Sequence, residues 1–543
     1  MLFHTFEFLI FAVIFTALYF AMRRRVTAQN ILILAGSWLF YGWWDVRFLH
    51  LLLVSTALDY STAIVIDKGS MSGRARLGTS LFVILSAVLL IGVNWSGGVL
   101  APQLATSSTA LWSVAITGGA VLALNAIYLA TNHLRHDTKR RIAIWASMVG
   151  NLGILLTFKY FDFFAASLAS LAQSTFGVTP SDWTLGFVLP VGISFYTFQT
   201  MSYTIDIYRR DMAAETRFVN FAAYVAYFPQ LVAGPIERGT ALVPQFGVER
   251  QLPSFEKVRR GAWLIVWGLF KKVVIADNMA TVVNGIFGPY DGGDYTIPKD
   301  GLTLLVGVYA FAFQIYGDFS GYTDMARGIS KLLGFELMRN FDIPYFATSP
   351  SDFWRRWHIS LSSWLRDYLY IPLGGNKGGS WSTYRNLTVT MLLGGLWHGA
   401  SWNFVIWGAY HGLLLSIYRA LGVRTERGAY SPLITFLLGL LMFHLTCIGW
   451  LLFRAQDVGT ISAFFQGIFL HPTASDATWE ALGTVVRFCW ILIAFELVQF
   501  AMRTHDPMAR WPWFVRLNVW VLVITAILAM ASSKTQDFIY FAF

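Results

Sequence analysis

The sequence of 543 residues predicts an all-α, polytopic integral membrane protein built as a bundle of helices. Its composition is the first reason, because 56% of the residues are hydrophobic and only 13% are charged. Soluble proteins carry about 25% charged residues, so lipid must solvate this chain. The second reason is a series of apolar runs that approach or reach the ~20 residues needed to cross a bilayer. We expect a single transmembrane domain over 1–543, and the short alternating segments of an outer-membrane barrel are absent.

The N-terminal helices are expected within 6–168. The first covers 6–22 and is followed by three arginines, which predicts a retained helix with an outside N-terminus instead of a cleaved signal. Two helices follow between residues 31 and 66, then spans near 81–93 and 111–130, and another begins at residue 143. The net charge of +10 fits cytoplasmic loops that contact anionic membrane lipid, and nucleic-acid binding is not expected.

The central part of the chain carries polar and helix-breaking residues inside apolar runs. The segment 190–210 is too polar for a lipid-facing helix and predicts an interior position. Prolines interrupt 218–239, which favours a re-entrant or in-plane element. Lys271 and Lys272 within an apolar run either snorkel or mark a break. The next span, 302–316, should place Asp318 at its inner end.

The segment 351–385 is basic and contains WRRWHISLSSWL, which is amphipathic at helical spacing. The apolar run 386–417 is longer than one span, so it requires a hairpin or a broken helix. C-terminal helices are expected within 433–532, with spans near 433–452, 490–502 and 519–530. The two cysteines, Cys447 and Cys489, are expected to be small buried hydrophobes without a disulfide.

His398 is the first candidate catalytic residue. It lies thirteen residues after Arg385, which is ~20 Å of helical rise and more than halfway across a ~30 Å hydrocarbon core. An ionisable group at that depth is a functional-site hypothesis. A neutral imidazole there can take a proton from an attacking hydroxyl, or it can be a hydrogen-bonded packing residue. Residue spacing alone does not decide between the catalytic and the packing role of His398. His411 and His444 present the same two alternatives, and for both we favour the packing role.

His358 is the second candidate, flanked by Arg355 and Arg356. The histidine could orient an acyl donor while the arginines bind phosphates of a coenzyme A thioester. Spacing alone favours the alternative that these arginines follow the positive-inside rule and contact lipid headgroups. Thioesters suit the site because a thiol with a pKa of about 8.5 leaves readily.

Other chemistries have weaker signals in this sequence. A GxSxG elbow and a P-loop are absent, which disfavours serine hydrolysis and phosphoryl transfer. His133 and His136 have nearly metal-ligand spacing but lack a carboxylate pair. We therefore expect no metal and no tightly bound cofactor.

Five ordered blocks carry a resemblance to a known family. They cover most of 190–412 and read PVGISFYTFQTMSYTIDIYR, YFPQLVAGPIER, FQIYGDFSGYTDMARG, DFWRRWHISLSSWLRDYLYIPLGG and LLGGLWHGASWNFVIWGAYHG. The sequence resembles the membrane-bound O-acyltransferase family, especially its bacterial branch for alginate O-acetylation and, more distantly, teichoic-acid D-alanylation. The resemblance implies about 11–14 membrane helices plus re-entrant or in-plane helices around a central tunnel.

The resemblance also implies roles for individual residues. The family's catalytic histidine maps to His398, and its second position, Asn or His, maps to His358. Asp318, Trp397 and Asn403 match motif positions near the active site. An extra apolar stretch over 81–130 and the block PIERGTALVPQF depart from the alginate-type pattern, so the acceptor stays open.

These observations predict a membrane O-acetyltransferase subunit of the bacterial inner membrane. It would transfer acetyl from a cytoplasmic thioester, with acetyl-CoA as donor substrate, to a polysaccharide hydroxyl or a periplasmic SGNH-type acetyltransferase partner. One alternative is an acyl-carrier protein as donor, as in D-alanylation. Another is a transporter of acyl donor or polysaccharide, which broken helices and buried polar groups also fit. The scarcity of charge pairs within the predicted spans makes the transporter the least favoured.

Overall fold

The computed structural model describes residues 1–95, 103–177, 183–288, 298, 300–423, 430–532, 536 and 538–539. Within these ranges the secondary structure is helical except for one antiparallel pair of two-residue strands, β1 (Val93–Asn94) and β2 (Gln103–Leu104). Among the described residues, eight helical segments are long and apolar enough to cross a membrane. The predicted class, an all-α multi-pass membrane protein, is confirmed.

The chain forms two compact units. The first contains residues 1–232, 236–254 and 333–337, and the second contains 233–235, 255–332 and 338–543. The helices of the first unit are α1 (Phe6–Ala21), α2 (Val26–Gly42), α3 (Val46–Lys68), α4 (Gly73–Leu90), α5 (Ser108–Thr131), α6 (His136–Leu155), η1 (Leu156–Tyr160), α7 (Phe161–Phe176), α8 (Ile193–Arg209), α9 (Phe218–Val225), α10 (Phe228–Leu231), α11 (Gly239–Leu242) and η2 (Val243–Phe246).

Helix α8 is the polar helix of the first unit, and the structure confirms its interior position. It packs against α3 and α6, and Ser194, Gln199, Ser202 and Asp206 are all buried. The buried carboxylate of Asp59 on α3 accepts hydrogen bonds from side chains of α6 close to α8. Such bonds between helices satisfy polar groups that lipid cannot hydrate.

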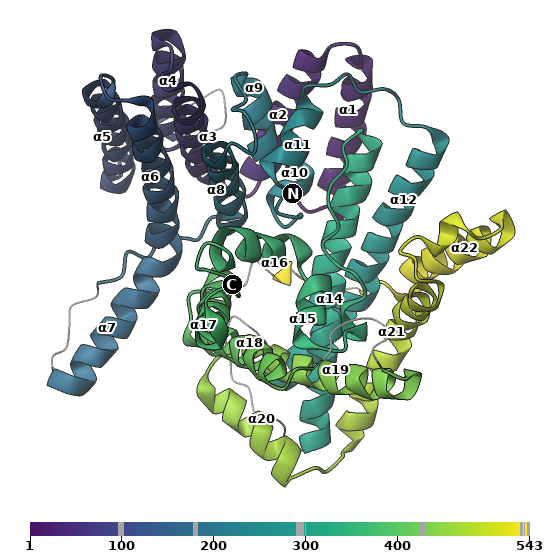
Figure 1. Cartoon of the computed structure of the whole chain (residues 1–543). Coiled ribbons are helices and arrows are strands. Elements are labelled where there is room, and N and C mark those ends of the chain that lie inside the picture. Colours follow the sequence, from purple (N-terminus) through teal and green to yellow (C-terminus); the bar gives the residue numbers. More distant parts are fainter. Residues whose placement is uncertain are drawn as a thin grey trace. The chain divides into compact units, whose positions relative to one another are not determined.

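The helices of the second unit are α12 (Phe255–Phe270), η3 (Lys271–Ala276), α13 (Asp277–Phe287), α14 (Gly301–Leu332), η4 (Pro344–Phe346), α15 (Pro350–Arg356), α16 (Ile359–Leu365), η5 (Arg366–Tyr370), α17 (Gly379–His398), α18 (Trp402–Ala420), α19 (Pro432–Arg454), α20 (Val458–Leu470), α21 (Asp476–Met502), η6 (Pro507–Ala509) and α22 (Trp513–Met530). Its centre is α14, which packs against α12, α13, α19, α20 and α21 (Figure 1).

Two membrane spans predicted for this unit are shorter than the helices observed. The predicted span 302–316 is part of α14, which continues to Leu332, so Asp318 lies in mid-helix and not at its end. The polar residues that follow, such as Ser320 and Thr323, suggested the end of the membrane span. They are buried within the protein, and the helix continues through them. The predicted span 490–502 is the second half of α21, and α20 was not predicted.

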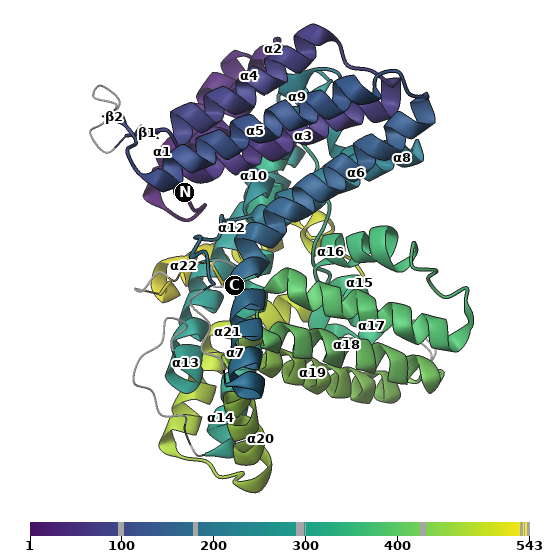
Figure 2. The same ribbon diagram turned by 90° about the vertical axis from the view of Figure 1, so that its left-hand side faces the viewer.

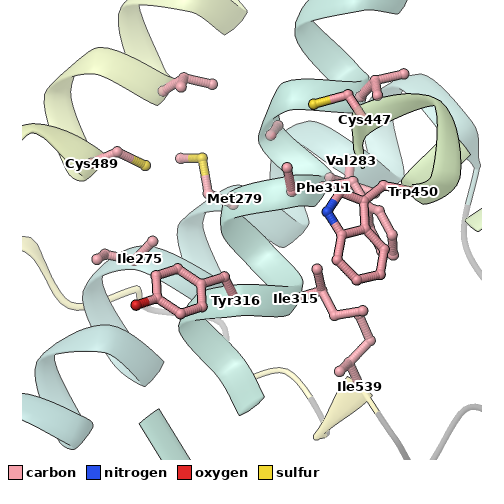
Figure 3. Close-up of a cluster of buried hydrophobic side chains, with 14 of the residues drawn as sticks. Ile275, Met279, Val283, Phe311, Ile315, Tyr316, Cys447, Trp450, Cys489 and Ile539 are labelled. Atoms are coloured by element: carbon pink, nitrogen blue, oxygen red, sulfur yellow. The ribbon is translucent and has the colours of Figure 1, made fainter. Parts of the chain in front are cut away.

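The apolar core of the second unit surrounds α14. Figure 3 shows Phe311 and Ile315 of α14 among Met279, Trp450 and both cysteines. Cys447 and Cys489 are free and buried, which confirms the expectation that they pack as small hydrophobic residues.

Helices α12 and α14 approach each other through glycines. A Cβ atom on Gly321 would lie 2.8 Å from the carbonyl oxygen of Gly268, and one on Gly268 would lie 2.5 Å from that of Gly321. Both distances are shorter than a side chain allows, so glycine is required for this helix pair to pack.

We expect Gly321→Val to lower the thermal unfolding temperature of the detergent-purified protein by several degrees. The added side chain would overpack the contact at a cost on the order of 1–3 kcal/mol. Gly118→Val on α5, where a Cβ atom meets nothing within 4 Å, is the matched control. Equal unfolding temperatures for both variants would show that the close contact is unimportant.

Candidate active site

His398 is the last residue of α17, at the turn of a tight hairpin with α18. The predicted hairpin is therefore confirmed, and the residues from Arg385 to His398 belong to one helix, as the depth estimate assumed. The hairpin is tight because glycines face each other. A Cβ atom on Gly395 would lie 2.1 Å from the carbonyl oxygen of Phe404, and one on Gly408 would lie 2.4 Å from that of Met391.

Aromatic rings surround the buried imidazole of His398, which is 4% exposed. The ring centroids of Trp407, Trp397 and Phe453 lie 5.0, 5.1 and 5.3 Å from it, each edge to face. These walls keep water away from the imidazole and lower the local dielectric constant, so a hydrogen bond or charge near His398 has a larger effect than in water.

The structure brings the two predicted histidines together. The ring centroids of His358 and His398 are 6.4 Å apart. Trp397 contacts both, at 5.8 Å from His358 and 5.1 Å from His398. Three of the sequence-predicted site residues thus form one buried cluster in the second unit.

His358 has a left-handed backbone conformation with φ 43° and ψ 55°. The stretch WRRWHISLSSWL, which has helical spacing, is thus divided between two short helices, because α15 ends at Arg356 and α16 begins at Ile359. Non-glycine residues seldom adopt this conformation, and histidine does so more readily than most. His358 caps α16, since its Nδ1 accepts a hydrogen bond of 3.3 Å from the backbone N–H of Leu361.

Asn340 holds the segment that follows His358. Its side-chain oxygen accepts hydrogen bonds from the backbone N–H and the hydroxyl of Ser360, at 3.1 and 2.8 Å. Its backbone oxygen accepts one from the N–H of Ile359 at 2.9 Å. These bonds fix the break between the two short helices, and with it the direction of the His358 ring.

Burial lowers the pKa of His358, which lies outside the eight spans, to about 3. The ring is therefore neutral at physiological pH. Because Nδ1 accepts the bond from Leu361, the single ring hydrogen is on Nε2, which is a hydrogen-bond donor. In the unfolded chain the pKa is about 6.5, so this group reduces stability as pH falls from 6.5 towards 3.

Asp318 is a charge-paired residue rather than a group facing the imidazoles. Its carboxylate lies 3.0 Å from the Nζ of Lys272 and accepts a 2.6 Å hydrogen bond from the backbone N–H of Ile539. Lys272 also lies 3.0 Å from Asp277. The next residue after Asp318, Phe319, packs on His358 with centroids 4.7 Å apart. Asp318 thus fixes α14 where it supports the His358 ring.

Of the two alternatives for Lys271 and Lys272, snorkelling or a break in the helix, the structure shows the break, a π-helical segment, η3. Both lysines are 3% exposed, and Lys271 pairs with Asp324 at 2.7 Å. The expected scarcity of charge pairs within the apolar helices is also corrected. Asp318 and Asp324 lie far along the chain from the lysines that they pair with, whereas Asp277 is nearby. A π-helical segment has one more residue in its hydrogen-bonded turn than an α-helix. Such segments are frequent at functional sites.

The other predicted residues have different environments. The Asn403 amide donates to the backbone oxygen of Ala455 and joins α18 to the end of α19. Arg356 is buried between Asp352, at 3.0 Å, and the backbone oxygen of Asp342, so it is structural. Arg355 is the exposed one of the pair, with 57% of its side chain accessible and Asp352 at 3.9 Å.

The remaining histidines of the core agree with structural roles. His411 is buried against Trp407, with centroids 4.7 Å apart, and stacks on Phe353. His444 is exposed and lies within hydrogen-bonding distance of the Tyr309 hydroxyl at 2.9 Å.

Sequence reasoning did not identify several residues that shape this site. Trp407 and Phe453 wall His398, and Asn340 and Lys272 hold His358 and Asp318. The dense aromatic pattern after His398 could have pointed to Trp407. The other three are recognised only through contacts between segments far apart in the chain.

Comparison with known proteins defines the class. A model of the membrane-bound O-acyltransferase family matches residues 209–453. The chain is 37% identical over 513 residues to the probable alginate O-acetylase of Pseudomonas aeruginosa, covering 92% of this chain and 82% of that protein. The chain therefore belongs to the membrane-bound O-acyltransferase family, as the five sequence blocks indicated, and is a multi-pass membrane O-acyltransferase.

Two further relatives show the range of its similarity. The peptidoglycan O-acetyltransferase of Helicobacter pylori is 34% identical over 466 residues, which cover 77% of this chain and 85% of that protein. The teichoic acid D-alanyltransferase of Bacillus subtilis is 25% identical over 286 residues, which cover 49% of this chain and 69% of that protein.

We expect His358→Asn to retain the fold and His358→Val to lose stability. Asparagine adopts left-handed backbone angles and caps helices well, whereas valine does neither. The cost for valine is about 2–3 kcal/mol from the lost cap and the strained backbone together. Thermal unfolding in detergent measures it. A valine variant as stable as the asparagine variant would contradict the cap and the strain.

We expect Lys272→Met to destabilise the protein by about 3–5 kcal/mol, because it leaves two buried carboxylates without their cation. The double variant Lys272→Met with Asp318→Asn removes one of these charges and should be less destabilised than the sum of the single variants. Chemical unfolding of the purified variants gives the three values. Strict additivity would show that the pair does not interact.

Proposed function

We propose that the chain transfers an acetyl group from acetyl-CoA to a polysaccharide hydroxyl, directly or through a periplasmic SGNH-type acetyltransferase partner. The observation that carries this proposal is the buried pair of histidines, 6.4 Å apart, with different chemical abilities. The placement in a bacterial inner membrane, with the N-terminus outside and a tunnel joining the two faces, is part of the proposal.

His398 is the base in the proposed reaction. It accepts the proton of the acceptor hydroxyl as that oxygen attacks the carbonyl carbon of the thioester. The carbon–oxygen bond forms and the carbon–sulfur bond breaks, so the acetyl group becomes an ester. The thiolate that leaves recovers the proton from the imidazolium of His398, and the histidine is neutral again.

His358 is the electrophilic partner. Its Nε2–H donates a hydrogen bond to the carbonyl oxygen of the thioester, where negative charge develops in the transition state. The low pKa of His358 keeps this group neutral, so it can polarise the carbonyl but does not compete with His398 for the proton. The aromatic walls exclude water, which would otherwise hydrolyse the thioester.

The nature of the acceptor follows from what the relatives act on. The names of these relatives include alginate and peptidoglycan, two polymers with free sugar hydroxyl groups, and similarity to both supports a polysaccharide acceptor. The exposed Arg355 is the candidate contact for the donor's phosphates, and Arg356 is excluded from that role by its buried ion pair.

We expect His398→Ala to reduce acetyl transfer by roughly 10²–10⁴-fold, the usual contribution of a general base, at unchanged protein level. The measurement is the ester-linked acetate content of the cell-surface polymer, with immunoblotting for the protein. His444→Ala, which changes an exposed histidine, is the matched control. Normal polymer acetylation in the His398 variant would refute its role.

An assay with purified wild type and the His398→Ala variant distinguishes acetyl-CoA from an acyl-carrier protein as the donor. Wild type in nanodiscs is supplied with radiolabelled acetyl-CoA or with an acetylated carrier protein, and release of free thiol is followed. Turnover with the carrier protein alone would replace acetyl-CoA as the donor. Binding without any transfer, in wild type and His398→Ala alike, would favour the transporter alternative.

A further inference from the structure

Helices α3, α4, α5 and α6 of the first unit lie next to one another (Figure 2). Residues of these four helices line a groove that neither the candidate active site nor the family motifs involve. Its volume is about 1550 Å³. Helix α5 packs against α4, whereas α6 packs against α3 and α8. The groove therefore opens between α5 and α6, with α3 as its floor. We call it the α3–α6 groove.

One end of the α3–α6 groove is basic. Arg76 of α4 and Lys139 of α6 line it there, together with Tyr128 and Asn132. The Arg76 guanidinium lies over the Tyr128 ring, 4.8 Å from its centroid, and Lys139 donates a 3.4 Å hydrogen bond to Asn132. Neither cation has an ion-pair partner among the residues that the structure describes, so this end attracts an anion.

A polar contact between helices crosses the α3–α6 groove at some distance from its basic end. The two ring nitrogens of His50 lie 2.9 Å from the Ser86 hydroxyl and 3.1 Å from the Thr117 hydroxyl, joining α3, α4 and α5. Ser86 is ten residues after Arg76 on α4, which is ~15 Å of helical rise. That distance is half of a ~30 Å hydrocarbon core, so the part of the groove between the cations and His50 is one leaflet deep.

The walls between these two levels are apolar and not filled by protein. Leu58, Ala120, Leu124 and Ala146 line the groove. Gly153 also lines it, and a Cβ atom there would meet nothing within 4 Å. A long apolar chain fits such a channel, and the length between the charged end and His50 matches the acyl chains of one leaflet.

We propose that the α3–α6 groove binds one anionic phospholipid, with its phosphate between Arg76 and Lys139 and its acyl chains directed towards His50. Charge complementarity selects this occupant, because basic pockets between membrane helices bind anionic headgroups. A single-span helix from another protein would need to pass His50 and would leave both cations unpaired. The inference does not depend on the proposed transfer reaction.

The test uses the full chain, purified in mild detergent, delipidated and returned to nanodiscs that contain phosphatidylglycerol or phosphatidylcholine. Native mass spectrometry counts the phospholipid molecules that stay bound. We expect one tightly bound phosphatidylglycerol in wild type. Arg76→Gln with Lys139→Gln should weaken its binding about thirtyfold.

The matched control is Arg74→Gln with Arg141→Gln. It removes the same charge from the same two helices, at exposed positions that do not line the groove, and should bind phosphatidylglycerol like wild type. Gly153→Leu fills the apolar part without touching the charges and should also displace the lipid, with the unfolding temperature of delipidated wild type.

Three outcomes would overturn the proposal. The first is equal retention of phosphatidylcholine and phosphatidylglycerol, and the second is equal loss of lipid in the groove variants and the control. The third is a second copy of the chain or a single-span polypeptide bound in place of lipid, detected as a mass shift that Gly153→Leu abolishes.

Discussion

The buried cation of Lys272 is the constraint on which the second unit depends. It lies between the carboxylates of Asp277 and Asp318, at 3.0 Å from each, and donates to the backbone oxygen of Gln536. Charges inside a membrane protein persist only when paired, so η3, α14 and Gln536 must stay together. The position of α14 in turn places Phe319 against His358. The aromatic surroundings of the two imidazoles are thus held in place through a buried charged cluster on η3 and α14.

The contribution of each histidine follows from its local structure. His398 is placed by a helix hairpin whose backbones touch at Gly395 and Gly408, which leaves the imidazole at the turn among aromatic rings. His358 is placed by a helix break that Asn340 stabilises. The hairpin places the ring of His398, and the hydrogen-bonded break places the ring of His358. Together they define the distance between the two imidazoles, and Trp397 packs against both. That arrangement supports a division into one proton acceptor and one hydrogen-bond donor.

The fold class and several of the helices could be predicted from the sequence because hydrophobicity and length are properties of each segment by itself. The apolar runs predicted the fold class, and the spacing from Arg385 to His398 correctly predicted that both lie on one helix. The length of the apolar run 386–417 predicted a hairpin or a broken helix, and the structure has the hairpin. The polar residues of α8 predicted an interior helix.

The rest depends on contacts between distant segments. The left-handed angles of His358 need Asn340, eighteen residues earlier, and the local amphipathic pattern suggested a continuous helix instead. The sequence places Asp277 close to Lys272, but the other two partners, Asp318 and the backbone oxygen of Gln536, are recognised only in the fold. Arg355 and Arg356 look equivalent in sequence, but only the fold shows that Asp352 and Asp342 bury one of them.

Helix α5 has a consequence for how the protein should be handled outside the cell. Ala110 is its one buried residue in the described structure, so its place beside α4 depends on the surrounding solvent more than on protein packing. The bilayer completes the wall of the first unit in the way that a neighbouring subunit would in an oligomer. A detergent that strips bound lipid therefore removes a part of the tertiary structure and acts on α4 and α5 as a local denaturant.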